Sequence, residues 1–139
     1  MTATLQPRSN AHRWIAVAAL VWNLLGLMMF VMQISMSAEQ VAALPAPERA
    51  VYETTPAWLT AAFGVAVVAG VLGSVGLLMR RRWAVPCFAV SLAAMLVQFA
   101  GAYLATPAWQ AFGVGGLVMP IVLLGIGAAL LVHARRVTP

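Results

Sequence analysis

The chain has 139 residues, of which 63% are hydrophobic and only 8% are charged, and its formal net charge is +5. Soluble domains typically contain about 25% charged residues, and a small domain leaves much of its surface exposed. The composition therefore excludes a soluble globular protein and predicts a single integral membrane domain over residues 1–139. All eight basic residues are arginines, and seven lie just outside apolar runs, so we interpret them as topology determinants and expect no nucleic-acid partner.

The first apolar run extends from Trp14 to about Ile34. A helix needs about 20 apolar residues to cross a bilayer, and this run is long enough. A signal peptide is the competing interpretation, because Arg8 and Arg13 precede the run and small residues follow it. The run is long for the apolar part of a signal peptide, so we expect a retained membrane helix.

A polar segment follows, from about residue 35 to residue 55, and we expect it to form a loop outside the membrane. It contains all three acidic residues of the chain, Glu39, Glu48 and Glu53. Pro45 and Pro47 are expected to break regular structure. The stretch from Ser37 to Leu44 could form a short surface helix.

Three further apolar runs complete the chain, at about residues 56–79, 83–104 and 107–134. Within lipid, every backbone polar group must be bonded inside the structure, so spanning segments are helices or closed barrels. These runs are too long for barrel strands. The sequence therefore predicts an all-α membrane protein, a four-transmembrane-helix bundle.

The arginines predict the orientation of this bundle. With four spans, seven arginines fall on one side of the membrane and only Arg49 falls on the other. Cytoplasmic loops carry the excess of Lys and Arg, so we expect both termini in the cytoplasm. Four tryptophans lie at the ends of the runs, where aromatic belts form: Trp14, Trp58, Trp83 and Trp109.

The sequence contains an internal repeat. The segments Tyr52–Trp58 and Tyr103–Trp109 are identical at five of seven positions, and Ala-Phe-Gly-Val follows each of them. Both contain Thr-Pro-Ala-Trp, in which Thr is expected to cap a helix and Pro to occupy its first position. Convergence on a common helix start is the alternative. We expect two tandem helical hairpins, a parallel repeat about an axis along the membrane normal.

Small residues recur along the second run, at Ala66, Gly70, Gly73 and Gly76. Such spacing lets two helices approach closely in a membrane. The contact could lie within the bundle or between two copies of the chain.

Few polar side chains lie within the runs. Asn23 and Ser91 are at similar depth and could form a hydrogen bond with each other across the bundle. A pocket for a small neutral solute could be built from four side chains, Asn23, Gln98, Tyr103 and Trp22. The alternative is that the polar groups bond between helices and fix their packing.

No Asp, Glu, Lys or Arg lies within any of the four runs. Proton-coupled carriers usually need an ionisable group inside the membrane, so coupling by a buried charge is not expected. His12 and His133 lie at the cytoplasmic ends of their runs, and we interpret both as interfacial.

No metal site, cofactor or enzymatic activity is expected. The single cysteine, Cys87, excludes an intramolecular disulfide and reads as a small packed hydrophobe. Met28, Met32 and Met36 recur every fourth residue. Thioethers bind cuprous ions, but methionine is also an ordinary apolar filler, and no Cys or His lies near these three. No Ser-His-Asp set or metalloprotease motif is present.

The start of the fourth run contains Gly113-Val114-Gly115-Gly116, followed by Met119-Pro120. Glycine and proline at these positions predict a loosened or kinked helix. Such a kink could admit a ligand or a neighbouring helix. A phosphate-binding loop is not expected, because no Gly-Lys-Ser/Thr follows.

The chain resembles one family over nearly its whole length. The resemblance is carried by four segments: Trp22–Gly26, Tyr52–Trp58, Arg81–Pro86 and Gly115–Pro120. They are similar to a group of small four-span bacterial inner-membrane proteins often labelled as candidate sugar transporters. That family has Gly-Pro-Gly-Gly where this chain has Gly113–Gly116. The resemblance implies transport in the bacterial inner (plasma) membrane and supplies no binding residues.

Two functional hypotheses follow. The first is a transporter of a small neutral solute, which we expect to need a homodimer because four helices enclose little space. The second is a non-catalytic accessory subunit that packs against a larger membrane complex. A polar cavity lined by Asn23 and Gln98 would favour the first, and a sealed bundle would favour the second.

Overall fold

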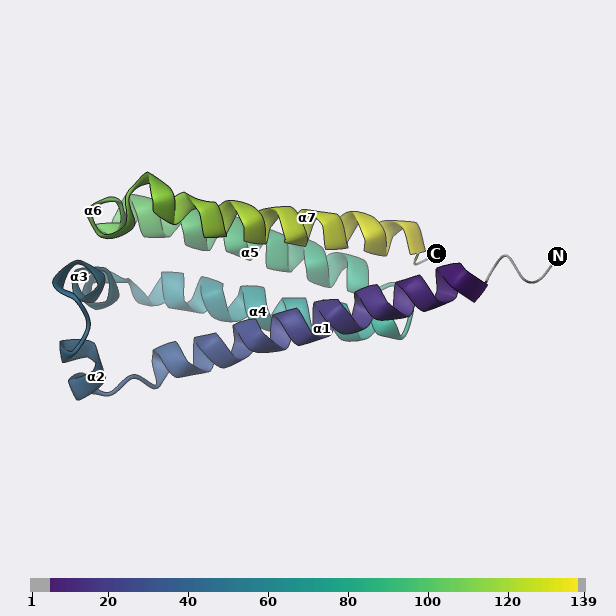
Figure 1. Ribbon diagram of the computed structural model, residues 1–139, viewed down its shortest axis with the longest axis horizontal. Helices are drawn as coiled ribbons and strands as arrows, with labels where there is room; N and C mark the ends of the chain where they lie inside the picture. Colours follow the sequence, from purple (N-terminus) through teal and green to yellow (C-terminus); the bar gives the residue numbers. More distant parts are fainter. Residues whose placement is uncertain (1–5, 138–139) are drawn as a thin grey trace.

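The computed structural model describes residues 6–137, and within them it contains helices and no strand (Figure 1). The helices in chain order are α1 (Gln6–Ile34), α2 (Ala38–Ala42), α3 (Ala46–Thr54), α4 (Ala57–Leu78), α5 (Ala84–Ala105), α6 (Ala108–Phe112), the 3₁₀ turn η1 (Val114–Leu117) and α7 (Val118–Val137). Four segments are long and apolar enough to cross a membrane: Asn10–Ile34, Ala57–Leu78, Ala84–Ala105 and Val114–Val137. The predicted all-α membrane bundle of four spanning helices is confirmed.

The four long helices pack in the order α1, α4, α5, α7, each against the next. Both ends of the described chain and the turn between α4 and α5 lie at one end of the molecule, which we call the termini end (Figure 1). The other end, which we call the capped end, carries α2, α3, α6 and η1. The two outer helices, α1 and α7, converge at the termini end and separate towards the capped end.

A core of small and apolar residues holds the four helices together at the termini end. It consists of Ala16, Leu77, Ala84, Phe88 and Ala134, none more than 3% exposed. Alanines let the helix backbones approach closely at this point. Large apolar side chains elsewhere are exposed, as Trp14 (71%) and Met29 (64%) are, and in a bilayer such side chains face lipid.

The turn between α4 and α5 closes α4 through two backbone hydrogen bonds. The amide of Arg81 donates to the carbonyl of Gly76 at 2.8 Å, and the amide of Arg80 donates to that of Leu77 at 3.1 Å. Arg80 has a φ of 54°, so it takes the left-handed conformation that usually falls to glycine in this type of helix end. The short turn keeps α4 and α5 adjacent and antiparallel.

The segment between α1 and α4 is more ordered than expected. The predicted surface helix near residues 37–44 is confirmed as α2, which starts with a reciprocal cap between Ser37 and Gln40. The expected break in regular structure lies at residues 43–45, between α2 and α3, where Pro45 precedes α3; Pro47, in contrast, lies in the first turn of α3 and does not break it. Proline is compatible with the first turn of a helix, where its missing N–H has no partner to lose.

The threonines of the repeated motif do not cap the helices that follow them, so that prediction is wrong. Thr55 Oγ1 donates to the carbonyl of Val51 at 2.6 Å, and Thr106 Oγ1 donates to that of Ala102. Each threonine therefore closes the helix that precedes it. The two copies of the motif therefore share this threonine hydrogen bond at the end of the preceding helix. The helices that follow them differ in length, because α6 has 5 residues and α4 has 22, so the tandem repeat stays a prediction.

The fourth apolar run was expected to form one helix from Pro107 to about Ala134, and the structure divides it at Gly113. This residue has φ 61° and ψ −156°, a conformation open essentially to glycine alone. The break predicted in this region is therefore confirmed. The fourth membrane-crossing segment therefore begins at Val114, and α6 (Ala108–Phe112) precedes it as a separate short helix.

Candidate functional site

Asn23, in the middle of the membrane-crossing part of α1, joins this helix to the last turns of α4. Its Nδ2 donates to Ser74 Oγ at 3.1 Å and to the carbonyl of Ala19 at 2.8 Å. Ser74 is fully buried and donates its own hydroxyl hydrogen to the carbonyl of Gly70 at 2.8 Å. Both hydrogens of the Asn23 amide are therefore used within the bundle.

Gly70 provides the space that the Asn23 side chain occupies. A Cβ at this position would lie 2.0 Å from Asn23 Oδ1 and 3.3 Å from Ser91 Oγ. Asn23 and Ser91 thus approach α4 from two neighbouring helices, α1 and α5. They do not bond to each other as the sequence suggested, because Ser91 Oγ donates to the carbonyl of Ala66 at 2.6 Å.

The four small residues of α4 face the interior. Ala66, Gly70, Gly73 and Gly76 are all buried. A Cβ at Gly73 would lie 3.0 Å from the ring of Phe88, and one at Gly76 would lie 3.1 Å from Trp83. The absence of a Cβ at both positions therefore lets α5 and the residue before it pack closely against α4. The structure uses this row for packing inside the bundle, which is one of the two alternatives the sequence left open.

The structure places the side chains suggested for a solute pocket in different surroundings. Gln98 is half-buried on α5, with Tyr103 further towards the capped end. The hydroxyl of Tyr103 is buried without a hydrogen-bond partner. The Tyr103 ring packs edge-on against the ring of Trp109, with the two ring centroids 4.9 Å apart. Neither of the two hollows described below is lined by Asn23, Gln98 or Tyr103. Only Trp22 borders one of them.

An apolar hollow of about 220 Å³ lies between α1 and α7, and we call it the wedge. Its lining residues are Ile15, Ala18, Ala19 and Trp22 on α1, with Ile126 and Leu130 on α7. It adjoins the core at the termini end, because Leu130 of its lining also packs against that core. It contains no side chain that could bind a charged or strongly polar solute.

A pair of histidines joins α1 to α7 one helical turn below the wedge. His12 Nδ1 lies 3.1 Å from His133 Nε2, and the two rings stack with centroids 5.3 Å apart. His12 Nε2 lies 2.9 Å from the carbonyl oxygen of Leu77, and the residue is only 6% exposed. The sequence placed both histidines at the interface but gave no sign that they pair, because they are 121 residues apart.

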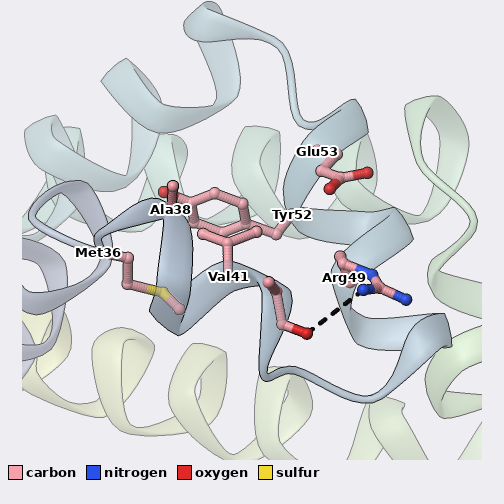
Figure 2. A pocket seen from close by; sticks show the side chains of 7 residues that line it. Met36, Ala38, Val41, Arg49, Tyr52 and Glu53 are labelled. Atoms are coloured by element: carbon pink, nitrogen blue, oxygen red, sulfur yellow. Dashed lines mark hydrogen bonds between the residues drawn. The ribbon is translucent and has the colours of Figure 1, made fainter.

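The larger hollow, of about 570 Å³, lies at the capped end between α2 and α3 (Figure 2). It is lined by Met36, Ala38, Val41, Ala42, Arg49, Tyr52 and Glu53. Arg49 Nη1 donates to the carbonyl of Ala42 at 3.3 Å, and Tyr52 Oη donates to that of Gln33 at 3.3 Å. These two bonds fasten α3 to α2 and to the end of α1, so Arg49 and Tyr52 both line this hollow and hold the fold together.

The described residues offer little for metal binding. Within residues 6–137, no group of three His, Cys, Asp or Glu side chains could hold an ion. Met28 and Met32 are 52% and 62% exposed on the membrane-crossing part of α1, while Met36 lines the hollow at the capped end. Met36 therefore lies beyond the membrane-crossing part of α1 that carries the other two methionines.

No family model, curated protein or solved structure matches this chain. Its function is therefore inferred from its own contacts.

Proposed function

We propose that the protein is a non-catalytic, multi-pass subunit of a bacterial inner membrane, and that it packs against a transmembrane helix of a partner. The observation that carries this proposal is the use of Asn23. Its amide hydrogens bond to Ser74 and to the Ala19 carbonyl, so the most deeply placed amide in the bundle has no donor left for a solute. Polar groups used in this way specify helix packing.

The proposed orientation has both termini in the cytoplasm. Described arginines gather at the termini end: Arg13, Arg80, Arg81, Arg82, Arg135 and Arg136. Arg49 lies at the capped end, together with all three glutamates of the chain. Positive charge concentrates on the cytoplasmic side of membrane proteins, and this distribution supports the assignment.

We assign the partner contact to the wedge. Within α7, only Gly127 and Ala134 are buried, so this helix has much surface left to cover. The wedge offers an apolar recess at which the side chains of another transmembrane helix can interdigitate. The partner is either a different membrane protein or a second copy of this chain.

Facilitated passage of a small neutral solute, such as a sugar, is the second candidate. Trp22 lines the wedge and offers a flat stacking surface to a sugar ring. The wedge holds about 220 Å³, less than the roughly 300 Å³ at which ligand pockets begin. A homodimer that closes two such wedges against each other is therefore part of this candidate.

Photo-crosslinking in intact cells tests the accessory-subunit proposal. A benzophenone amino acid replaces Trp22 in the wedge or, as a matched control, Leu24, which is similarly exposed at nearly the same depth of α1 but lies outside the wedge (39% and 45%). We expect one adduct of defined mass from position 22 and none from position 24. An adduct of twice the chain's mass identifies a second copy. No adduct at position 22, or the same adducts at both positions, contradicts the proposal.

A further inference from the structure

We propose that His12 and His133 form a proton-operated latch that holds α1 against α7 and closes the floor of the wedge. Protonation of both rings opens the latch, so that the wedge connects with the termini end. This inference does not depend on what occupies the wedge.

The proton count of the pair follows from its hydrogen bonds. The carbonyl of Leu77 can only accept, so His12 Nε2 carries a hydrogen and donates it to that oxygen. The contact between His12 Nδ1 and His133 Nε2, at 3.1 Å, then needs one hydrogen shared between two nitrogens. The latch is intact when one of these nitrogens is protonated. When both are, two N–H groups oppose each other and the bond is lost.

The charges around the pair disfavour a closed latch with two protonated rings. Six arginines share this end of the bundle: Arg13 on α1, Arg80, Arg81 and Arg82 in the turn, and Arg135 and Arg136 on α7. The membrane-crossing part of α5 contributes no charged residue, and every glutamate lies at the capped end. With no side-chain carboxylate nearby, a doubly protonated pair is relieved only by separation and access to water.

The His12 ring is enclosed, because His12 is 6% exposed and its Nε2 is bonded to the Leu77 carbonyl, whereas His133 is half-buried. Ala16, Leu77 and Ala134 are all 0% exposed beside the pair. Because His12 is held in place, we expect two charged imidazoles to separate by movement of His133, on α7, away from α1. The wedge begins one turn away, at Ile15 on α1 and Leu130 on α7, so this movement extends it to the termini end.

Distances between spin labels on α1 and α7 test the latch. The labels occupy Ala11 and Val132, both exposed near the pair, in a Cys87→Ser background reconstituted into nanodiscs. Between pH 8 and pH 5, we expect the mean distance to lengthen reversibly. A wild-type distance that is the same at both pH values overturns the proposal.

Two variants and one control pair decide whether the histidines cause the movement. His133→Gln retains one donor and one acceptor opposite His12 without a titrating ring, so the short distance should persist at both pH values. His133→Ala removes the bond, and the long distance is expected at both. A pH response of His133→Gln equal to wild type overturns the proposal. A matching change between labels at Val68 on α4 and Val97 on α5, both exposed, also overturns it, because the movement is then not confined to α1 and α7.

Discussion

Asn23, in the middle of the membrane-crossing part of α1, donates a hydrogen bond of 3.1 Å to Ser74, one turn before the end of α4. In hydrocarbon the second amide hydrogen of Asn23 has no water as an alternative partner, so it is bonded to Ser74 only while the two helices stay in register. Asn23, which a transporter would need for binding its solute, therefore contributes to the stability of the bundle instead.

Gly70→Ala tests the close approach at this contact. A Cβ there would lie 2.0 Å from Asn23 Oδ1, so the amide must move and lose its bond to Ser74. Overpacking of this kind costs about 1–3 kcal/mol. The free energy of unfolding, measured by SDS titration in mixed micelles with tryptophan fluorescence, should fall by that amount. Gly125→Ala is the control, because nothing lies within 4 Å of a Cβ there. Equal effects at the two glycines would contradict the assignment.

A double-mutant cycle with Asn23→Ala and Ser74→Ala measures the bond itself. The two side chains share one hydrogen bond, and each single change already removes it. The double variant should therefore lose less stability than the sum of the losses in the two single variants. The coupling expected for a bond between membrane helices is about 0.6 to 1.7 kcal/mol. Strictly additive losses in the same SDS titration would show that the pair contributes nothing as a pair.

Gly113→Ala tests the break between α6 and α7. Since φ 61° and ψ −156° suit glycine alone, the alanine variant should lose about 1–3 kcal/mol of stability. Gly115→Ala, two residues later, serves as the control, because a Cβ there meets open space and its φ is unexceptional. If Gly113→Ala is as stable as Gly115→Ala by thermal unfolding in detergent, the break is not a fixed feature of the fold.

The two tyrosines of the repeated motif should respond differently to loss of the hydroxyl. Tyr103→Phe removes a buried hydroxyl without a partner, so stability should stay the same or rise. Tyr52→Phe removes the bond to the Gln33 carbonyl and should cost about 0.5–1.5 kcal/mol. Thermal unfolding of the two variants side by side provides the comparison, and the reverse order would contradict these contacts.

Hydrophobicity and spacing predicted the helices of this protein well. Runs of apolar residues located the four spans, because lipid requires long uninterrupted helices. The glycine row of α4 indicated close packing, and Gly113 indicated a break, because both depend on the absence of a Cβ. These features belong to single segments and can be recognised one segment at a time.

Contacts between distant segments could not be predicted in this way. The depth of Asn23 and Ser91 was evident, but not the rotation of their helices, which turns both towards α4 and brings in Ser74. Ser74 lies four residues after Gly70, on the same buried face of α4 as the small residues, and that position was the available signal. The pairing of His12 with His133 depends on how two outer helices converge, which no local pattern contains.

Uptake of labelled sugars into proteoliposomes tests most directly whether the polar residues serve packing or passage. We predict that the wild-type protein takes up no more than empty vesicles, and that Asn23→Ala lowers the free energy of unfolding. Saturable uptake by the wild type, abolished by Asn23→Ala or Gln98→Ala in protein that remains folded, would contradict the account.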